Sequence, residues 1–459
     1  MAQPRPYFDS DLKLLDMTPE IFAHIIHLLV EDVGVFNAFQ YRPVCKTFAA
    51  EIFYNVISLR PAESFRVPEG ISMVQHRSRR DLSKRFLEAH SYSFLRARVE
   101  AANGFHSHLI TLARDVADAL LRYEGSHSNS LRSRYRDDIC KSFLANSQDT
   151  CLYDRLLLDK RSGFKTDLRY ADMMPNVQEF LLTATAAAVG SQKTLDFFST
   201  VGCPRYTYMY PYSNLLCAAV GSGKICTTRS LLELIRDALK RMTGLFPFTR
   251  AQWIEIGRVQ WFQPWHFQDA ISITIREGFT EIGQLLYEFL AEHPEANSRT
   301  HDIRSATMIE CLERDNVDLI YPALRCLHNG ALKFANEDLR YLFNRGNGKV
   351  LHRLIHDGLV NAHRSNSTTP LKVVLDNKKY CHAKVLLDFG VDIDGTPYAN
   401  GGVSVLWHAV QSGNTEHVKF LLDHGANPES HEGWRSPLKE AKKRGRKNII
   451  ELLQNATKK

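Results

Sequence analysis

A short landmark returns along the C-terminal part of the chain at a nearly constant spacing. Triplets of the form Thr/Ser-X-Leu begin at residues 369, 404 and 436, which are 35 and 32 residues apart. Gly358, Gly390 and Gly425 keep the same rhythm, with spacings of 32 and 35 residues. A period of about 33 residues is typical of solenoids in which each unit needs its neighbours to bury its apolar face. The repeat therefore predicts an all-α stacked array.

The clearest unit spans residues 400–431, NGGVSVLWHAVQSGNTEHVKFLLDHGANPESH. Its first helix carries a small residue, Ala409, where neighbouring helices approach each other. Its second helix places Val418, Leu421 and Leu422 on one face, at the i, i+3, i+4 spacing of a buried helical stripe. Gly425 follows that helix, at a position where a positive φ is commonly needed.

This unit resembles the ankyrin repeat. The segment SVLWHA at residues 404–409 stands where that family has TPLHxA, Gly413-Asn414 matches the turn between the two helices, and Gly425-Ala426-Asn427 closes the unit. The resemblance implies an all-α ankyrin-repeat solenoid that holds a partner protein. Weaker units extend upstream, so we expect about eight repeats over residues 176–457, of which the first four or five are degenerate. The last unit, residues 432–457, has the polar outer side of a capping repeat.

The N-terminal segment, residues 15–52, reads as three short helices. The first begins at Thr18-Pro19, a capping residue followed by proline at the first helical position. One apolar face then consists of Ile21, Ile25, Leu28 and Leu29. Pro43 is expected to open the third helix.

This segment resembles an F-box, the helical module that docks on the adaptor subunit of cullin-type ubiquitin ligases. It departs from the family in having Thr18 for the first proline, a longer linker at residues 30–34, and no tryptophan near its end. The resemblance implies the following adaptor-binding residues: Pro19, Ile21, Ile25, Leu28, Val44, Cys45 and Phe48. The alternative is a helical cap that packs on the array.

These patterns divide the chain into an F-box-like helical module (1–59), a helical linker region (60–175) and the ankyrin repeats (176–457). Within the linker region we expect helices at residues 86–98 and 108–122. The polar segments at residues 78–84 and 126–136 are expected to form loops.

The composition of the chain indicates the cellular compartment in which it is expected. The nine cysteines are scattered and form no CxxC pair, which argues against a disulfide framework or a zinc ribbon. The sequence contains no uninterrupted stretch of about 18 apolar residues, so no membrane-spanning helix is predicted. These features fit the reducing cytoplasm or nucleus, and no membrane partner is expected.

The charge of the chain is concentrated at its end. Residues 435–459 contain nine Lys/Arg and two Asp/Glu, a sum of +7 that equals the net charge of the whole chain. The run KKRGRK at residues 442–447 is either a nuclear import signal or a solvated capping helix. Direct nucleic-acid binding is disfavoured, because the basic residues form no broad stripe.

Motifs of catalysis are incomplete. The run GSGK at residues 221–224 lacks the earlier glycine and the final Ser/Thr of a phosphate-binding loop. His352 and His356 have a zinc-compatible spacing, but no HExxH glutamate lies between them. We expect no catalytic residue, no metal site and no cofactor; an enzyme with an unrecognised site is the third alternative.

The partner should lie across the projecting loops and first helices of the repeats. The residues expected on this face are Tyr398, Trp407, Trp434 and Arg435, since large aromatics and arginine are common interface anchors. Trp407 has packing on a neighbouring repeat as its alternative. Trp253, Trp261 and Trp265 form a second aromatic cluster, which either anchors a partner or covers the side of the array.

The leading hypothesis is a non-enzymatic interaction scaffold, acting as substrate receptor of a cullin-type ubiquitin ligase through its adaptor. The plan of the chain resembles fungal F-box/ankyrin proteins. The second hypothesis is a nuclear coregulator that binds a transcription factor, since ankyrin proteins of similar build are transcription coregulators, some of them acting on fungal secondary-metabolite genes.

Overall fold

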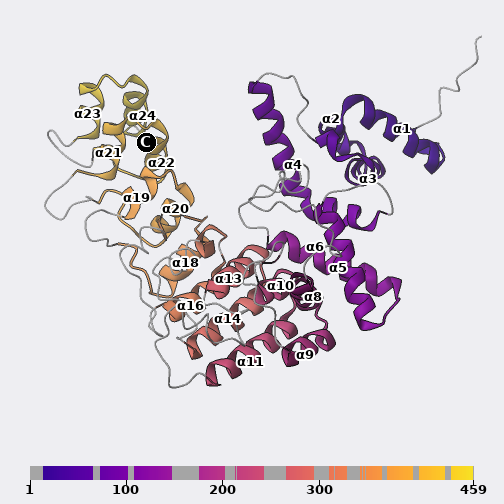
Figure 1. Ribbon diagram of the computed structural model, residues 1–459. Coiled ribbons are helices and arrows are strands. Elements are labelled where there is room, and N and C mark those ends of the chain that lie inside the picture. Colours follow the sequence, from indigo (N-terminus) through magenta and orange to yellow (C-terminus); the bar gives the residue numbers. More distant parts are fainter. Residues whose placement is uncertain are drawn as a thin grey trace, which may run out of the picture. The chain divides into compact units, whose positions relative to one another are not determined.

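The computed structural model (Figure 1) describes a set of segments that cover most of the chain. They are residues 14–65, 73–101, 108–146, 175–201, 212, 214–241, 265–293, 310–314, 316–327, 342–343, 345–346, 348–363, 370–395, 403–429 and 436–457. Every element longer than one residue in these segments is helical, so the all-α prediction is confirmed there. The chain forms two compact units, residues 1–266 and 267–459, which are described separately.

The first unit begins with short helices and continues with long ones. Its elements are η1 (Leu14–Asp16), α1 (Pro19–Val33), α2 (Val35–Gln40), η2 (Arg42–Val44), α3 (Lys46–Tyr54), η3 (Asn55–Leu59), η4 (Ala62–Phe65), α4 (Met73–Glu100), α5 (His108–Glu124), α6 (Asn129–Ala145), α8 (Pro175–Val189), α9 (Gln192–Val201), α10 (Leu215–Gly221) and α11 (Ile225–Arg241).

The second unit consists of shorter helices. They are α13 (Trp265–Glu277), α14 (Thr280–Glu292), α16 (Val317–Leu327), α18 (Lys349–His356), α19 (Pro370–Asp376), α20 (Tyr380–Asp388), α21 (Val405–Ser412), α22 (Thr415–Asp423), α23 (Pro437–Lys443) and α24 (Lys447–Thr457).

The three N-terminal helices are present, with one boundary displaced. Helix α1 begins at Pro19 as expected and runs through the expected linker to Val33. The third helix, α3, begins at Lys46 and not at Pro43, which lies in the separate turn η2. Cys45 causes the interruption, because its backbone is extended and its Sγ accepts a hydrogen bond from the Phe48 amide at 3.4 Å.

The two polar segments predicted as loops are largely helical. Residues 78–84 lie inside α4, and most of residues 126–136 lie in α6. Both segments lack proline, and a helix can be polar on most faces when its side chains pair with one another. Lys84 and Glu88 form such an i, i+4 pair in α4, and the Ser128 side chain caps α6.

A buried arginine joins the N-terminal module to α4. The Arg98 side chain is fully buried and donates hydrogen bonds to the carbonyl oxygens of Ile57 and, at 2.7 Å, Arg60. Its guanidinium lies 3.5 Å from the centroid of the Phe94 ring. Burial lowers the pKa of Arg98 to about 9, which still leaves it charged at neutral pH. The end of η3 is therefore fixed to α4 by a desolvated, charge-assisted contact.

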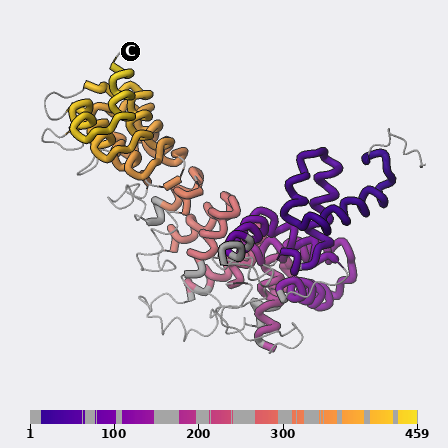
Figure 2. Tube along the Cα trace, turned by 90° about the horizontal axis from the view of Figure 1, so that it is seen from above, coloured from indigo at the N-terminus to yellow at the C-terminus, as the bar shows by residue number. Residues whose placement is uncertain are grey.

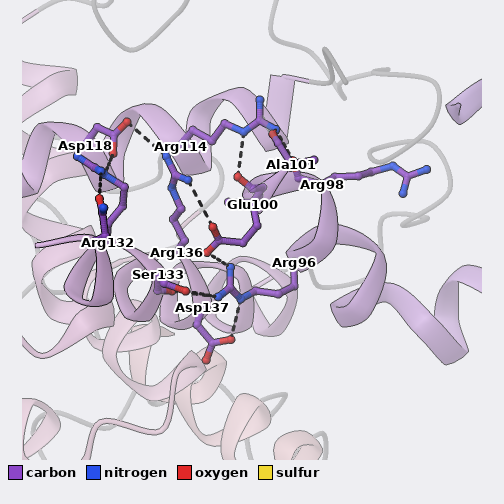
Figure 3. A network of polar contacts seen from close by, with 12 residues as sticks. Arg96, Arg98, Glu100, Ala101, Arg114, Asp118, Arg132, Ser133, Arg136 and Asp137 are labelled. Carbon is purple, nitrogen blue, oxygen red and sulfur yellow. Dashed lines mark hydrogen bonds and ion pairs between the residues drawn. The ribbon is translucent and has the colours of Figure 1, made fainter. Parts of the chain in front are cut away.

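Helices α4, α5 and α6 are held together by a network of ion pairs (Figure 3). Arg136 lies between two carboxylates, 3.5 Å from Asp118 and 3.6 Å from Glu100. Arg96 pairs with Asp137 at 3.0 Å. Burial alone would raise the pKa of Glu100, but Arg96 and Arg136 lower it below its usual range. Glu100 therefore stays ionised at neutral pH, and the ion pairs of this network bind the three helices to one another.

Helix α6 packs directly on the first repeat-like helices. Ser142 Oγ donates to the Ala218 carbonyl at 2.7 Å, and Asn146 Nδ2 donates to the Cys217 carbonyl at 3.0 Å. A Cβ atom at Gly221 would come within 2.8 Å of Asn146, so the close approach depends on glycine. Lys224, the lysine of the GSGK run, pairs with the Asp138 carboxylate at 2.7 Å. The GSGK run is thus a packed turn between α10 and α11.

The second unit is a stack of helix pairs (Figure 2). Helix α21 packs on α22 and α23, and α24 packs on α22 and α23, so each pair covers the next. The seam is apolar, with Leu406, Val410, Val418 and Leu421 each fully buried. Gly425 ends this unit with φ +91°, as the repeat pattern predicted.

We predict that Arg98→Met lowers the free energy of unfolding by roughly 2–4 kcal/mol, because two buried carbonyl oxygens lose their donor. Urea denaturation followed by circular dichroism measures the loss. Arg77→Met, the same change at an exposed position of α4, is the control and should stay within about 0.5 kcal/mol of the native protein. Equal losses in the free energy of unfolding would show that Arg98 stabilises the fold no more than an exposed arginine does.

We predict that Leu421→Asp unfolds the C-terminal repeats, at a cost of at least about 3 kcal/mol, because it places a carboxylate in the fully buried seam. Thermal melting monitored by circular dichroism tests this. Lys419→Asp, on the exposed side of the same helix, should melt almost as the native protein does. A near-native melt for Leu421→Asp would contradict the packing described here.

Candidate protein-binding surfaces

Exposed apolar side chains gather in the N-terminal module. Of the twelve large hydrophobic residues exposed in the described segments, eight lie between residues 14 and 59. They are Leu14, Leu15, Ile21, Leu28, Tyr41, Val44, Tyr54 and Leu59. Soluble proteins rarely leave apolar side chains concentrated on one surface unless that surface contacts another molecule.

Helix α1 carries two apolar stripes that face different ways. Phe22, Ile26 and Val30 are buried and form the core of the module. The stripe that the sequence singled out is turned outward, with Ile21 53% exposed, Leu28 51% exposed, and Ile25 and Leu29 half-buried. At about 100° per residue the centres of the two stripes are separated by roughly 120°. The folding of the module therefore uses the inner stripe and leaves Ile21 and Leu28 of the outer stripe exposed.

The other residues of the expected docking set divide between surface and core. Pro19 is exposed at the start of α1, Val44 is 66% exposed, and Cys45 is half-buried. Phe48 is buried, with its ring centroid 6.0 Å from that of Phe22 in an edge-to-face contact. Phe48 therefore contributes to the packing of α1 on α3.

Trp407 lies in the first helix of its repeat, α21, one turn after the Ser404 cap. Its side chain is 8% exposed, yet its indole Nε1 has no hydrogen-bond partner in the described segments. The same holds for Nε2 of the neighbouring His408, whose pKa is lowered by burial and by the charge of Lys372. Unsatisfied buried polar atoms cost stability, so two adjacent ones in a native helix require an explanation.

The other residues expected on the ankyrin face, Tyr398, Trp434 and Arg435, lie outside the described residues. So do Trp253 and Trp261, and the side chain of Trp265. Their assignment to a partner-binding face stays a prediction.

The basic run at residues 442–447 is folded. Lys442 and Lys443 end α23, Arg444 and Gly445 form the turn, and Lys447 begins α24. Arg444 pairs with the buried Glu440, and Arg446 Nη2 donates to the Gln411 carbonyl at 2.9 Å. The run is thus a helical hairpin that reaches the preceding repeat.

One feature of the turns escaped the sequence patterns. The helix-pair turns contain glycines with positive φ, namely Gly190, Gly223, Gly278, Gly346, Gly413 and Gly445. Lys378 occupies this place between α19 and α20, with φ +56°, and is the non-glycine residue with positive φ among the described residues. The sequence did contain a signal for this feature, because the turn at Lys378 has no glycine at the position where the turns named above have one.

The described residues offer neither a membrane-spanning helix nor a metal site. No helix among them is long and apolar enough to cross a membrane. Within the same segments, no group of three or more His, Cys, Asp or Glu side chains is placed to hold a metal ion. His352 and His356 are exposed, and His356 contacts Asp357 at 2.8 Å.

Comparison with known proteins supports the repeat assignment. A family model for ankyrin repeats (3 copies) matches residues 339–432 and 372–459. Among curated proteins, no match was found. Among solved structures, the ankyrin repeat domain of Bcl-3, a member of the IkappaB protein family, is 18% identical with a TM-score of 0.31, covering 40% of this chain and 85% of that chain. The assignment rests on the family model: residues 339–459 consist of ankyrin repeats, a repeat type that serves protein–protein interaction.

Proposed function

We propose that this chain is a two-surface interaction scaffold. Its N-terminal module docks on the adaptor subunit of a cullin-type ubiquitin ligase, and its ankyrin repeats hold the protein to be ubiquitinated. The observation that carries the proposal is the outward apolar stripe of α1, which folding leaves uncovered. The upstream repeats, from residue 176 to the start of the family match, belong to the same array in this proposal.

Three features of the N-terminal module support docking over a purely structural cap. The module already has its own core, formed by Phe22, Ile26 and Phe48. It is attached to α4 by Arg98 through the far end of η3, which does not use the outer stripe. The outer stripe is therefore free for a partner, and its apolar character suits a stable interface core.

The orphaned ring nitrogens of α21 support a partner on the ankyrin face. In this proposal the Trp407 side chain turns outward on binding, so that an oxygen of the bound protein accepts from its indole N–H, which is buried and has no partner in the described segments. A buried donor that is paired only in the complex favours association, because the free protein carries the cost of leaving it unpaired. Tyr398, Trp434 and Arg435, which the sequence also predicts on this face, complete the proposal.

The second hypothesis, a nuclear coregulator, drew on the basic run as an import signal. Arg444 and Arg446 are already engaged within the fold, by Glu440 and by the Gln411 carbonyl. An import receptor that reads an extended chain would have to compete with these contacts. We therefore favour the ligase-receptor proposal.

We predict that Ile21→Asp with Leu28→Asp weakens adaptor capture at least about tenfold, because the charges must be desolvated at an apolar interface. Immobilised native and variant chains are compared for recovery of adaptor and cullin, with a thermal melt of each. The control is Leu82→Asp, at a leucine of similar exposure outside the module. Failure of the native chain to bind adaptor, or undiminished binding by the double variant, would refute the docking proposal.

We predict that Trp407→Phe weakens binding of the repeat partner by about tenfold while the melting temperature is unchanged or higher. Phenylalanine keeps most of the apolar packing but removes the unsatisfied N–H. Titration of the captured partner against both proteins, with a parallel melt, separates the two effects. A lower melting temperature with unchanged affinity for the partner would show that Trp407 serves packing and not binding.

A further inference from the structure

The turns between the helices of successive repeats lie next to one another along one edge of the C-terminal array. Lys379 Nζ reaches the Gly346 carbonyl at 3.4 Å, and Arg446 reaches the Gln411 carbonyl at 2.9 Å. A shallow depression between two of these turns is lined by Asp376, Lys378 and residues 412–417. We call this row of turns, residues 377–379, 412–415 and 444–447, the turn edge.

Lysines occupy places on the turn edge where the local backbone disfavours them. Lys378 has φ +56°, a conformation that costs a side-chain-bearing residue free energy relative to glycine. Lys447 is the first residue of α24, where the partial positive charge of the helix N-terminus repels a cation. Both side chains are exposed, and neither forms an ion pair in the described segments. Local stability does not account for these two cations.

The carboxylates nearby are already partnered. Asp376 pairs with Lys372 at 2.6 Å, and Glu440 pairs with Arg444. Glu416 accepts a hydrogen bond from Tyr380 at 3.4 Å. His417 lines the same depression, and burial lowers its pKa, so it contributes no charge at neutral pH. The Tyr380 hydroxyl is neutral and leaves the charge of Glu416 in place, but residues 377–379, 412–415 and 444–447 contain five Lys/Arg and no Asp/Glu, so the net charge of the turn edge is positive.

We propose that the turn edge binds an acidic segment of a partner protein, whose carboxylates pair with Lys378 and Lys447. Two repeats separate these lysines, which corresponds to roughly 20 Å at 8–10 Å per packed layer of helices. An extended chain covers about 3.3 Å per residue, so carboxylates about six residues apart reach both lysines. Nucleic acid is the less favoured ligand, because the cations form a narrow row and not a broad basic face.

This inference rests on the proposed function of the repeats, which is to hold a partner protein. The turn edge is, however, a different surface from the outer stripe of α1 and from Trp407. Its test needs neither adaptor nor native partner. A fluorescein-labelled polyglutamate peptide is titrated against the full chain at low ionic strength, and fluorescence anisotropy reports binding.

Lys378→Gly with Lys447→Gln should weaken binding of this peptide by about fivefold or more, as expected for the loss of two exposed ion pairs. Lys378→Gly alone should also raise the melting temperature, since glycine fits the positive φ. If Lys378 were retained for stability, replacing it would not both weaken peptide binding and raise the melting temperature. The matched control, Lys384→Gln with Lys419→Gln, removes two exposed lysines from the outer sides of α20 and α22 and should bind as the native chain does.

Three results would overturn the inference. One is no measurable binding of the peptide to the native chain, and another is an equal loss in the turn-edge variant and its control. The third is tighter binding of a single-stranded DNA oligonucleotide of matched charge with the same loss in the turn-edge variant, which would assign the edge to nucleic acid. In each case adaptor capture by the native chain, measured separately, shows whether the proposed function itself survives.

Discussion

The C-terminal array depends on one constraint, which is that no helix pair in it is large enough to bury its own apolar face. Helices α21 and α22 reach full burial of Leu406 and Leu421 in a seam between neighbouring pairs. Stability is then a sum of contacts between neighbours, with the last pair turning a polar side to water. The exposed surfaces of such an array are free to vary, which makes them suitable for recognition.

The N-terminal module follows a different principle, in which one helix serves two apolar environments. The inner stripe of α1 packs against α3, while Arg98 and Arg60 tie the far side of the module to α4 and to the His27 carbonyl. A charged side chain is costly to bury unless nearby groups stabilise its charge, and two carbonyl oxygens and the Phe94 ring contact the Arg98 guanidinium. This attachment fixes the module without covering the outer stripe.

The sequence predicted those features that follow from local periodicity. The repeat spacing, Gly425 and the start of α1 at Pro19 depend on residues near each other in the chain, and they were anticipated correctly. The helical content of residues 78–84 and 126–136 was missed, because both segments are polar, yet neither contains a proline or glycine that would interrupt a helix. Which stripe of α1 faces inward, and that Phe48 packs on Phe22, depends on how the helices meet. Tertiary contacts of this kind cannot be read from the spacing of apolar residues along the sequence.

The contact between Arg446 and the preceding turn has a consequence for how such an array can evolve. The Arg446 guanidinium occupies the space that a Cβ atom at Gly413 would need, so any other residue at 413 would displace this side chain from its hydrogen bond to the Gln411 carbonyl. The turn at Lys378 already carries a side chain with positive φ, so it differs from the glycine turn that Arg446 contacts. Neighbouring repeats are therefore matched at this turn by a specific contact. A duplicated or exchanged unit would lose the hydrogen bond of Arg446 unless the turn beside it also carried glycine, so selection on one repeat extends to its neighbour.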